Sequence, residues 1–225
     1  MRRRHAAMTL ALCVAATACT TWQSRVMESH SLAADGHYEE ARAALEDALR
    51  IAREGGPQDP RIPDTLDRLG SLALSNGHDD EAHSRYEESL AIREKQLGPD
   101  ALDVTRSLTG LVEVEVWQGR YQHAFDLYQR VLTIREARLG PNHPLVALTL
   151  HNMARAYTMQ RNFDAAEPLF QRAIEIRTRS YGPESDEVAQ SLLGYAELLR
   201  FEGREDEAAT METRANRILA THRVP

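Results

Sequence analysis

The sequence has little cysteine and no excess of positive charge, and each shortage argues against a class of function. Lys95 is the one lysine among 27 basic residues, and 34 acidic residues give a formal net charge of −7. Nucleic acid is not expected as a partner, because neutralising phosphates requires clustered positive charge. Both cysteines, Cys13 and Cys19, lie within the first twenty residues. The rest of the chain therefore has no disulfide framework and no cysteine-based metal site.

The motifs of common catalytic sites are also missing. The sequence has no glycine-rich phosphate loop, no Gly-x-Ser-x-Gly turn, no dinucleotide fingerprint and no His-Glu-x-x-His run. His143 and His151 are eight residues apart, which places them about 80° apart around a helix and makes them a poor pair of metal ligands. We expect a protein that is not an enzyme and that uses no cofactor, metal or small-molecule substrate.

The N-terminus has the features of a secretory signal peptide. Three arginines, Arg2 to Arg4, precede an apolar run over residues 6–18. As a helix this run is about 20 Å long, too short for a bilayer core of roughly 30 Å. A positive start, a short apolar stretch and small residues at its end are typical of a signal peptide, which we place at residues 1–18.

The end of this segment allows two interpretations. Ala16-Thr17-Ala18 suits ordinary signal peptidase, whereas Ala16-Thr17-Ala18-Cys19 resembles a bacterial lipobox, in which Cys19 becomes the lipidated first residue. By resemblance to the sorting pattern of Gram-negative lipoproteins, in which Asp after the cysteine retains the protein in the inner membrane, Thr20 favours the outer membrane. We expect an outer-membrane lipoprotein facing the periplasm, with a soluble periplasmic protein as the alternative. Without residues 1–18 the charge is 24 − 34 = −10, so acyl chains rather than charge would anchor the chain.

The rest of the chain repeats with a period of 42 residues. Gly-Pro pairs begin at Gly56, Gly98, Gly140 and Gly182. The same spacing relates Ala82, Ala124, Ala166 and Ala208, and also Leu66, Leu108, Leu150 and Leu192. Several columns in one register predict a repeat architecture. The apolar spacing within each unit predicts two helices, the second ending at Gly-Pro, and no sheet is expected.

The predicted boundaries follow this period. The ranges are 19–56 for the lipid-attachment cysteine and a divergent first helix pair, then 57–98, 99–140 and 141–182 for the next three repeats, and 183–225 for the fifth repeat. Glu212 and Asn216 stand where earlier repeats have large apolar residues. The last helix is therefore predicted to be a polar cap, which a repeat array requires at its end.

Two sequence motifs resemble those of a known repeat family. Leu139-Gly140-Pro141-Asn142-His143-Pro144 and the segment from Ala166 to Arg177 resemble the tetratricopeptide repeat, in the 42-residue form found in kinesin light chains. The resemblance covers about residues 30–220. It implies an all-α, right-handed superhelical solenoid of about five helix-turn-helix repeats, whose concave groove is lined by the first helix of each repeat.

The resemblance also implies which residues face the groove. They are Arg68, Arg106, Trp117, His151, Asn152, Arg155, Met159, Arg200 and Phe201. Guanidinium groups bind carboxylates in bidentate fashion, and methionine or aromatic surface accepts apolar side chains. The groove therefore suits a peptide, extended or helical, with acidic and apolar residues. The alternative is that these arginines pair with Asp64, Asp67, Glu113 or Glu197 and form a solvated face.

Another arginine column recurs at Arg93, Arg135 and Arg177. A structural role repeats with the architecture whereas a binding site seldom does, so we expect these side chains to form hydrogen bonds or ion pairs between repeats. Together the patterns favour a non-enzymatic adaptor, anchored to the envelope, that binds a protein or peptide partner. The alternatives are a self-assembling structural component, whose apolar edges would include Trp22, and a soluble periplasmic binder without lipid.

Overall fold

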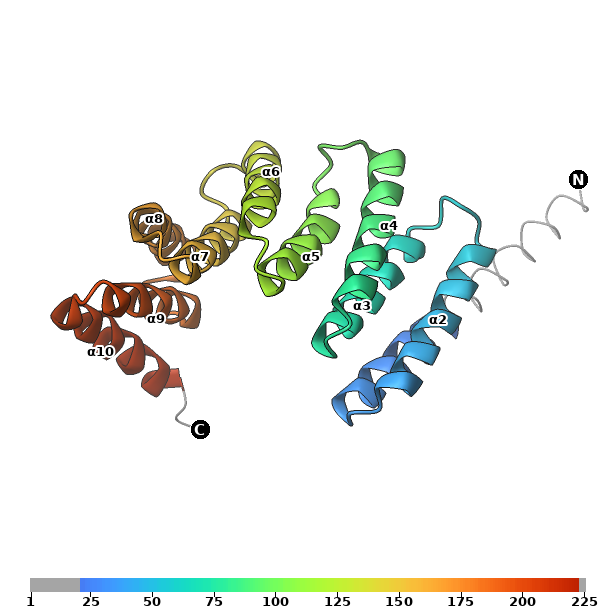
Figure 1. Cartoon of the computed structure of the whole chain (residues 1–225), viewed down its shortest axis with the longest axis horizontal. Helices are drawn as coiled ribbons and strands as arrows, with labels where there is room; N and C mark the ends of the chain where they lie inside the picture. The colour runs from blue at the N-terminus through green and yellow to red at the C-terminus, as the bar shows by residue number, and fades with distance from the viewer. Residues whose placement is uncertain (1–20, 223–225) are drawn as a thin grey trace, which may run out of the picture. The chain divides into compact units, whose positions relative to one another are not determined.

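The computed structural model describes residues 21–222, and these residues form helices joined by short turns (Figure 1). A helix over residues 21–34 precedes α2 (Tyr38–Glu54), α3 (Arg61–Ser75), α4 (Asp79–Leu97), α5 (Val104–Trp117), α6 (Tyr121–Leu139), α7 (Pro144–Met159), α8 (Phe163–Tyr181), α9 (Asp186–Phe201) and α10 (Glu205–His222). Residues 21–222 contain no strand, which confirms the all-α prediction. The predicted signal peptide and Cys19 lie outside the described residues. None of the described helices is long and apolar enough to cross a membrane.

The chain divides into two compact units at Val114, inside α5. In unit 1, Met1–Val114, α3 packs against both α2 and α4. In unit 2, Glu115–Pro225, α7 packs against α6 and α8, and α9 packs against α8 and α10. The helices α3, α7, α8 and α9 each contact a hairpin partner and a helix of a neighbouring hairpin, which is the nearest-neighbour packing of a repeat protein.

The columns with 42-residue spacing form the cores of the two units. The four leucines of the column, Leu66, Leu108, Leu150 and Leu192, and the four alanines, Ala82, Ala124, Ala166 and Ala208, are buried. In unit 2, Phe170 of α8 is buried between α7 and α9 and packs with Ala154, Leu198 and Leu199. An apolar helix face of this kind is stabilised only when the next hairpin covers it.

Two buried arginines join successive repeats of unit 2. The Arg135 guanidinium donates to the Leu145 carbonyl at 3.1 Å and to the Thr149 hydroxyl at 2.8 Å. The Arg177 guanidinium donates to the Glu187 carbonyl at 2.7 Å and to the Ser191 hydroxyl at 2.8 Å. In both cases the acceptors lie ten and fourteen residues further along the chain, on the first helix of the next repeat. The predicted structural role of these arginines is confirmed.

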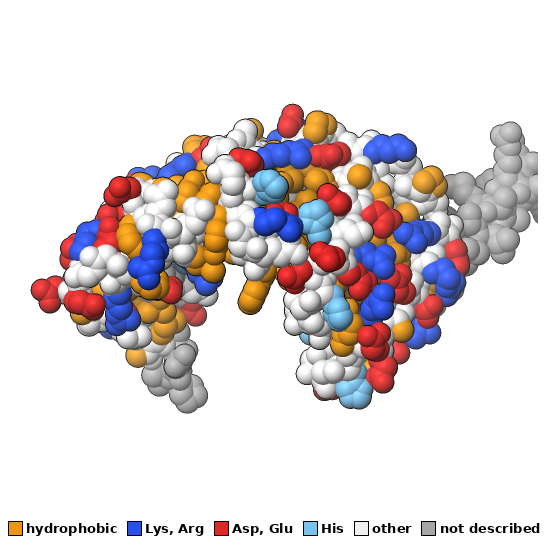
Figure 2. Space-filling model, viewed as in Figure 1, with side chains coloured by type: hydrophobic (Ala, Val, Ile, Leu, Met, Phe, Trp, Pro, Cys, Tyr) orange, Lys and Arg blue, Asp and Glu red, His pale blue; other side chains and the backbone are white. Residues whose placement is uncertain are grey.

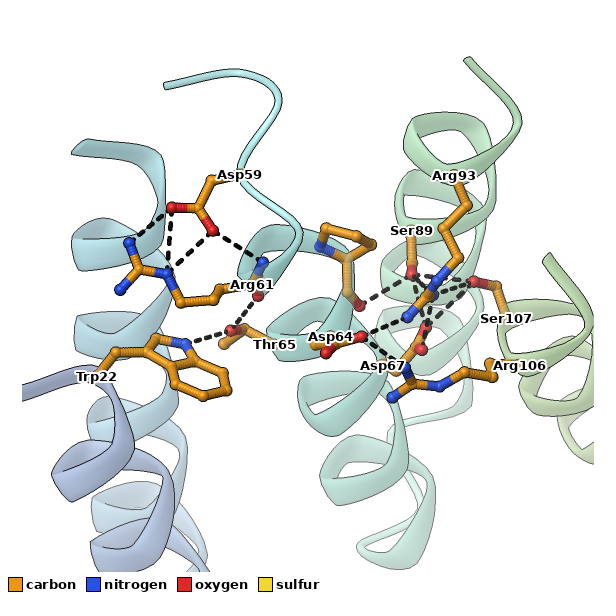
Figure 3. A network of polar contacts seen from close by, with 11 residues as sticks. Trp22, Asp59, Arg61, Asp64, Thr65, Asp67, Ser89, Arg93, Arg106 and Ser107 are labelled. Carbon is orange, nitrogen blue, oxygen red and sulfur yellow. Dashed lines mark hydrogen bonds and ion pairs between the residues drawn. The ribbon is translucent and has the colours of Figure 1, made fainter. Parts of the chain in front are cut away.

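Unit 1 uses the same arginine position with carboxylate partners added (Figure 3). Arg93 is buried and donates to the Ser107 hydroxyl at 2.6 Å. It also forms ion pairs of 2.7 Å with Asp64 and with Asp67 on α3. Arg93 therefore connects α4 both to α3 of its own hairpin and to α5 of the next.

The first repeat has no arginine at this position, and a tryptophan supplies the donor. Ala52 stands 41 residues before Arg93, and Thr65 stands 42 residues before Ser107. The Trp22 indole N–H donates to the Thr65 hydroxyl at 2.9 Å (Figure 3). Trp22 is half-buried and packs against the core of unit 1.

We expect Arg177→Met to lower the free energy of unfolding by about 2–4 kcal/mol, because it leaves a buried hydroxyl and a buried carbonyl without their donor. Urea unfolding of the full chain measures this loss. Arg179→Met is the matched control, since exposed Arg179 pairs with Glu175 one turn away and with no other acidic residue among 21–222. Such pairs contribute about 0.5 kcal/mol or less. Equal losses for the two variants would show that Arg177 is not an inter-repeat contact.

Candidate functional site

The helices α7 and α9 are neighbours in unit 2, and each has an exposed face. The α7 face includes Arg155 and Met159, and the α9 face includes Glu197 and Phe201. These residues recur at three- to four-residue intervals along each helix, so they form one stripe per helix. The two stripes together present charged and apolar side chains on a single face.

A pocket of about 340 Å³ opens between these two stripes. The residues that line it are His151, Arg155, Gln190, Leu193, Gly194 and Glu197. Of the predicted groove residues, His151 and Arg155 are thus brought together, whereas Asn152 is half-buried on α7 and does not line the pocket. The donors of Arg155 and Gln190 and the acceptor of Glu197 give the pocket a polar wall.

His151 is the one predicted groove residue that is buried, with 8% of its surface exposed. Its ring makes an edge-on contact with Phe170, with 5.5 Å between the ring centroids. Burial lowers the pKa of His151, and the nearby Arg177 and Arg155 lower it further, to about 4. The imidazole is therefore neutral at physiological pH.

Gly194 is a pocket residue that the sequence did not single out for function. A Cβ at this position would lie 2.9 Å from Phe170 Cε1 and 3.1 Å from His151 Cε1. Only glycine leaves room for both rings beneath α9 without displacement. The signal in the sequence was a glycine at a position facing the groove, inside a predicted helix.

The four predicted groove arginines differ in whether the protein neutralises them. Arg106 forms an ion pair with Asp64 at 2.8 Å (Figure 3), and Arg200 pairs with Glu212 at 2.5 Å. Arg106 therefore pairs with one of the carboxylates that the solvated-face alternative named, whereas the partner of Arg200 is a carboxylate that it did not name. Arg68 and Arg155 form no ion pair with any other residue among 21–222.

Arg68 lines a second pocket, in unit 1, between helix 21–34 and α3. This pocket has a volume of about 210 Å³. Val26, Leu45 and Leu72 provide apolar surface, and Ser29, His30, Ser71 and Ser75 provide hydrogen-bonding groups. Each of the two arginines without a carboxylate partner thus lines a pocket formed by first helices of consecutive repeats.

The predicted apolar groove residues are exposed at the ends of first helices. Trp117 is 77% exposed, Met159 58% and Phe201 47%. Arg161 lies over the Phe201 ring, with its guanidinium carbon 5.4 Å from the ring centroid. Arg161 has a φ of 59° in a turn where the other hairpins place glycine, and this left-handed backbone costs roughly 1 kcal/mol.

The faces of α2 and α4 differ from these sites in their electrostatics. Figure 2 shows acidic and basic side chains interleaved over this part of unit 1. The ion pairs that join α2 to α4 are Arg42–Glu81 at 3.2 Å, Arg53–Glu88 at 2.9 Å and Arg85–Glu46 at 2.5 Å. Because these charges neutralise one another, the second-helix faces are weaker candidates for an acidic partner than the two pockets.

Comparison with known families decides the identity of the repeat. The tetratricopeptide repeat family matches residues 29–95, 103–179 and 153–220. The chain belongs to this family. Tetratricopeptide repeat proteins are typically non-enzymatic scaffolds for protein–protein interaction. Among residues 21–222, no group of His, Cys, Asp or Glu has the arrangement of a metal site.

Solved structures with the same fold include tetratricopeptide repeats of the kinesin-light-chain kind. BtubC (BKLC) from P. vanneervenii is 20% identical, with a TM-score of 0.83 over 97% of this chain and 87% of that one. A putative kinesin light chain from Podosopora anserina is 22% identical, with a TM-score of 0.76 over 89% and 95%. A tetratricopeptide repeat protein from Parabacteroides merdae is 20% identical, with a TM-score of 0.60 over 91% and 68%. No curated protein matches this sequence.

The low pKa of His151 predicts a pH-dependent stability of this tetratricopeptide repeat chain. The unfolded state takes up a proton near pH 6.5 and the folded state only near pH 4, so stability is lost as pH falls through this window. Between pH 7.5 and 5 the loss from this group is about 2 kcal/mol. Urea unfolding at pH 7.5 and at pH 5 measures the free energy of unfolding. Between these pH values it should fall by about 2 kcal/mol less for His151→Gln than for the wild type. Identical decreases for the two proteins would contradict a neutral, buried His151.

Proposed function

We propose that this tetratricopeptide repeat protein is a non-enzymatic scaffold whose first-helix faces bind an acidic, partly apolar segment of a protein partner. The observation that carries the proposal is which of the groove arginines form an ion pair with a carboxylate of the same chain. Arg68 and Arg155 have no carboxylate partner among residues 21–222 and each lines a pocket, whereas Arg106 and Arg200 are neutralised. A guanidinium in a pocket, without a partner in its own chain, is suited to a carboxylate from another chain.

The apolar half of the proposal rests on Met159 and Phe201. Both are exposed on the same helices that form the unit 2 pocket. Aromatic, methionine and arginine side chains are enriched in protein interfaces. A partner segment that places a carboxylate at Arg155 and an apolar side chain at Met159 would therefore use both kinds of surface on α7.

We expect Arg68→Gln and Arg155→Gln each to lower partner recovery about tenfold, the equivalent of ~1.4 kcal/mol for a lost charge-assisted hydrogen bond. The measurement is crosslinking in intact cells, followed by purification of the tagged chain and quantitative mass spectrometry. Arg106→Gln is the matched control, because Asp64 already neutralises this exposed arginine. If all three variants recover the same proteins at wild-type levels, the pockets are not the binding sites.

We further propose that the scaffold is an outer-membrane lipoprotein held by Cys19. The proposal is supported by the lipobox-like sequence Ala16-Thr17-Ala18-Cys19 after a short apolar run. A helix is already present at residue 21, so little linker separates the acylated residue from the first repeat. Such an anchor would keep the repeats close to the periplasmic face of the membrane.

Replacing the lipidated residue tests the anchor. Cys19→Ser should move the chain from the membrane fraction to the soluble periplasmic fraction, because the acyl chains supply the membrane affinity of an acidic body. Cys13→Ser serves as the control and should leave the distribution unchanged. A wild-type chain that is already soluble in the periplasm would instead support the secreted form without lipid.

A further inference from the structure

Unit 1 has a pocket on the side of its second helices, outside the first-helix faces of the proposed partner site. The pocket has a volume of about 360 Å³ and lies between α2, the start of α3 and α4. Ile62, which is buried, and Ile92, which is half-buried, give it an apolar wall. Arg53, Glu88 and Lys95 are its charged lining residues. The pocket therefore combines apolar surface with charges of both signs.

This pocket lacks a hydrogen-bond donor that fills the equivalent place in unit 2. Arg172 of α8 stands two periods after Glu88 of α4, and its guanidinium donates to the Pro141 carbonyl at 3.2 Å. Glu88 is shorter, and an ionised carboxylate has no donor. Pro57 is the counterpart of Pro141 and lines the pocket, and its carbonyl accepts from Gln96 at 3.3 Å. In unit 1, a carboxylate and open space thus stand where unit 2 has a cationic donor.

The charged groups of the pocket are only partly paired. Glu88 accepts a hydrogen bond of 2.9 Å from Arg53 through Oε1, whereas an ionised carboxylate can accept about four. Lys95 is exposed in the last turn of α4. Its ammonium forms no ion pair and no hydrogen bond with any other residue among 21–222. The pocket can therefore accept hydrogen bonds from a cation at Glu88 and pair with an anion at Lys95.

The pocket lies at the same edge of unit 1 as the start of helix 21–34. Figure 1 shows the α2–α3 and α4–α5 connections at one edge of this unit, and the pocket lies between the first connection and the last turn of α4. Trp22 donates to Thr65 near the start of α3, at this same edge (Figure 3). Cys19 is three residues before Trp22, a span of at most about 11 Å. An acylated Cys19 would hold this edge, including Leu97, which is 52% exposed, against the lipid surface.

We propose that this pocket binds the headgroup of a membrane phospholipid that carries both a phosphate and a primary ammonium, as phosphatidylethanolamine does. The proposal rests on the proposed lipid anchor, which brings the pocket to the membrane. The ammonium donates to Glu88 and to the Pro57 carbonyl, in the place that a guanidinium fills in unit 2. Lys95 pairs with the phosphate. Ile92 and Leu97 lie beside these groups and face the lipid.

This chemistry gives the site a definite selectivity among headgroups. A primary ammonium has three N–H donors, whereas the trimethylammonium of a choline headgroup has none. The two headgroups carry the same charges, so a preference for ethanolamine measures the hydrogen bonds to Glu88 and Pro57. A headgroup without a cation leaves the Glu88 carboxylate facing the phosphate and binds more weakly.

The test uses the soluble headgroups glycerophosphoethanolamine and glycerophosphocholine as probes. The full chain in detergent, ¹³C-labelled at its isoleucine methyl groups, is titrated by NMR, and Ile92→Val assigns the pocket resonance. We expect the ethanolamine compound to shift the Ile92 signal saturably and to bind about tenfold more tightly than the choline compound. Ile176, two periods later and beside Arg172 in unit 2, is the internal control and should not shift. Equal binding of the two compounds, or no shift with either, overturns the proposal.

Three variants assign the contacts. Glu88→Gln removes the carboxylate charge and should reduce the preference for ethanolamine to about twofold or less. Glu54→Gln is the matched control, because this exposed carboxylate pairs with Arg50 and does not line the pocket, and it should leave the preference unchanged. Lys95→Gln should weaken binding of both compounds about tenfold. Unchanged affinities in Lys95→Gln would overturn the phosphate contact and with it the proposal.

Further arms separate the lipid from other ligands and from the anchor. In phosphatidylcholine nanodiscs, adding phosphatidylethanolamine should shift Ile92 as the soluble headgroup does, and no change there would overturn the membrane source. Glycerol 3-phosphate that binds as tightly as glycerophosphoethanolamine would indicate a simple anion site and overturn the proposal. If Glu88→Gln lowers recovery of a protein partner while neither headgroup shifts Ile92, the pocket is a protein site and the lipid proposal is wrong. If the chain is soluble in the periplasm but Ile92 responds selectively to ethanolamine, the anchor is wrong and the headgroup chemistry of the pocket is supported.

Discussion

The contact on which the structure depends is the covering of each hairpin by the next, held in register by a buried arginine. Arg135 and Arg177 reach a carbonyl and a hydroxyl on the first helix of the following repeat. An apolar face tolerates small sliding, whereas a guanidinium with two fixed acceptors does not. The hydrogen bonds thus add positional specificity to the hydrophobic burial that supplies most of the stability.

This arrangement determines where binding chemistry is possible. The buried faces and the arginine column are occupied by inter-repeat contacts, so recognition is left to the exposed faces of the helices. On α2 and α4 the exposed charges pair with one another. On first helices, Arg68 and Arg155 have no such partner and lie in pockets. The surface that we propose for binding is therefore the one whose charges have no carboxylate partner among residues 21–222.

Much of the fold was predictable because residues 42 positions apart occupy equivalent positions in successive repeats and share the same surroundings. Each core column repeats, so Leu66 and Leu150 could be recognised as buried without knowing any contact. The hydroxyl column of Ser107, Thr149 and Ser191 has the same period but was not recognised as the acceptor set of the arginines. Hydroxyls are common at the surface, and only the structure shows that these are buried against a guanidinium.

The candidate site was less predictable, since exposure and pairing depend on how far a side chain reaches across neighbouring helices. The period could not distinguish Arg106, which reaches Asp64, from Arg155, which reaches no carboxylate among residues 21–222. Nor could it indicate that His151 is buried while Met159, on the same helix, is exposed. The burial of His151 goes with its ring contact to Phe170 and with the space that Gly194 leaves for both rings.

The most direct test of the scaffold account is hydroxyl-radical footprinting of the chain with and without its recovered partner, because the method reports side-chain exposure. The account predicts that the partner protects Met159 and Phe201 on the first-helix faces. It also predicts that Tyr181, an exposed residue on second helix α8, keeps its reactivity. Protection of Tyr181 with Met159 and Phe201 unchanged would contradict the account.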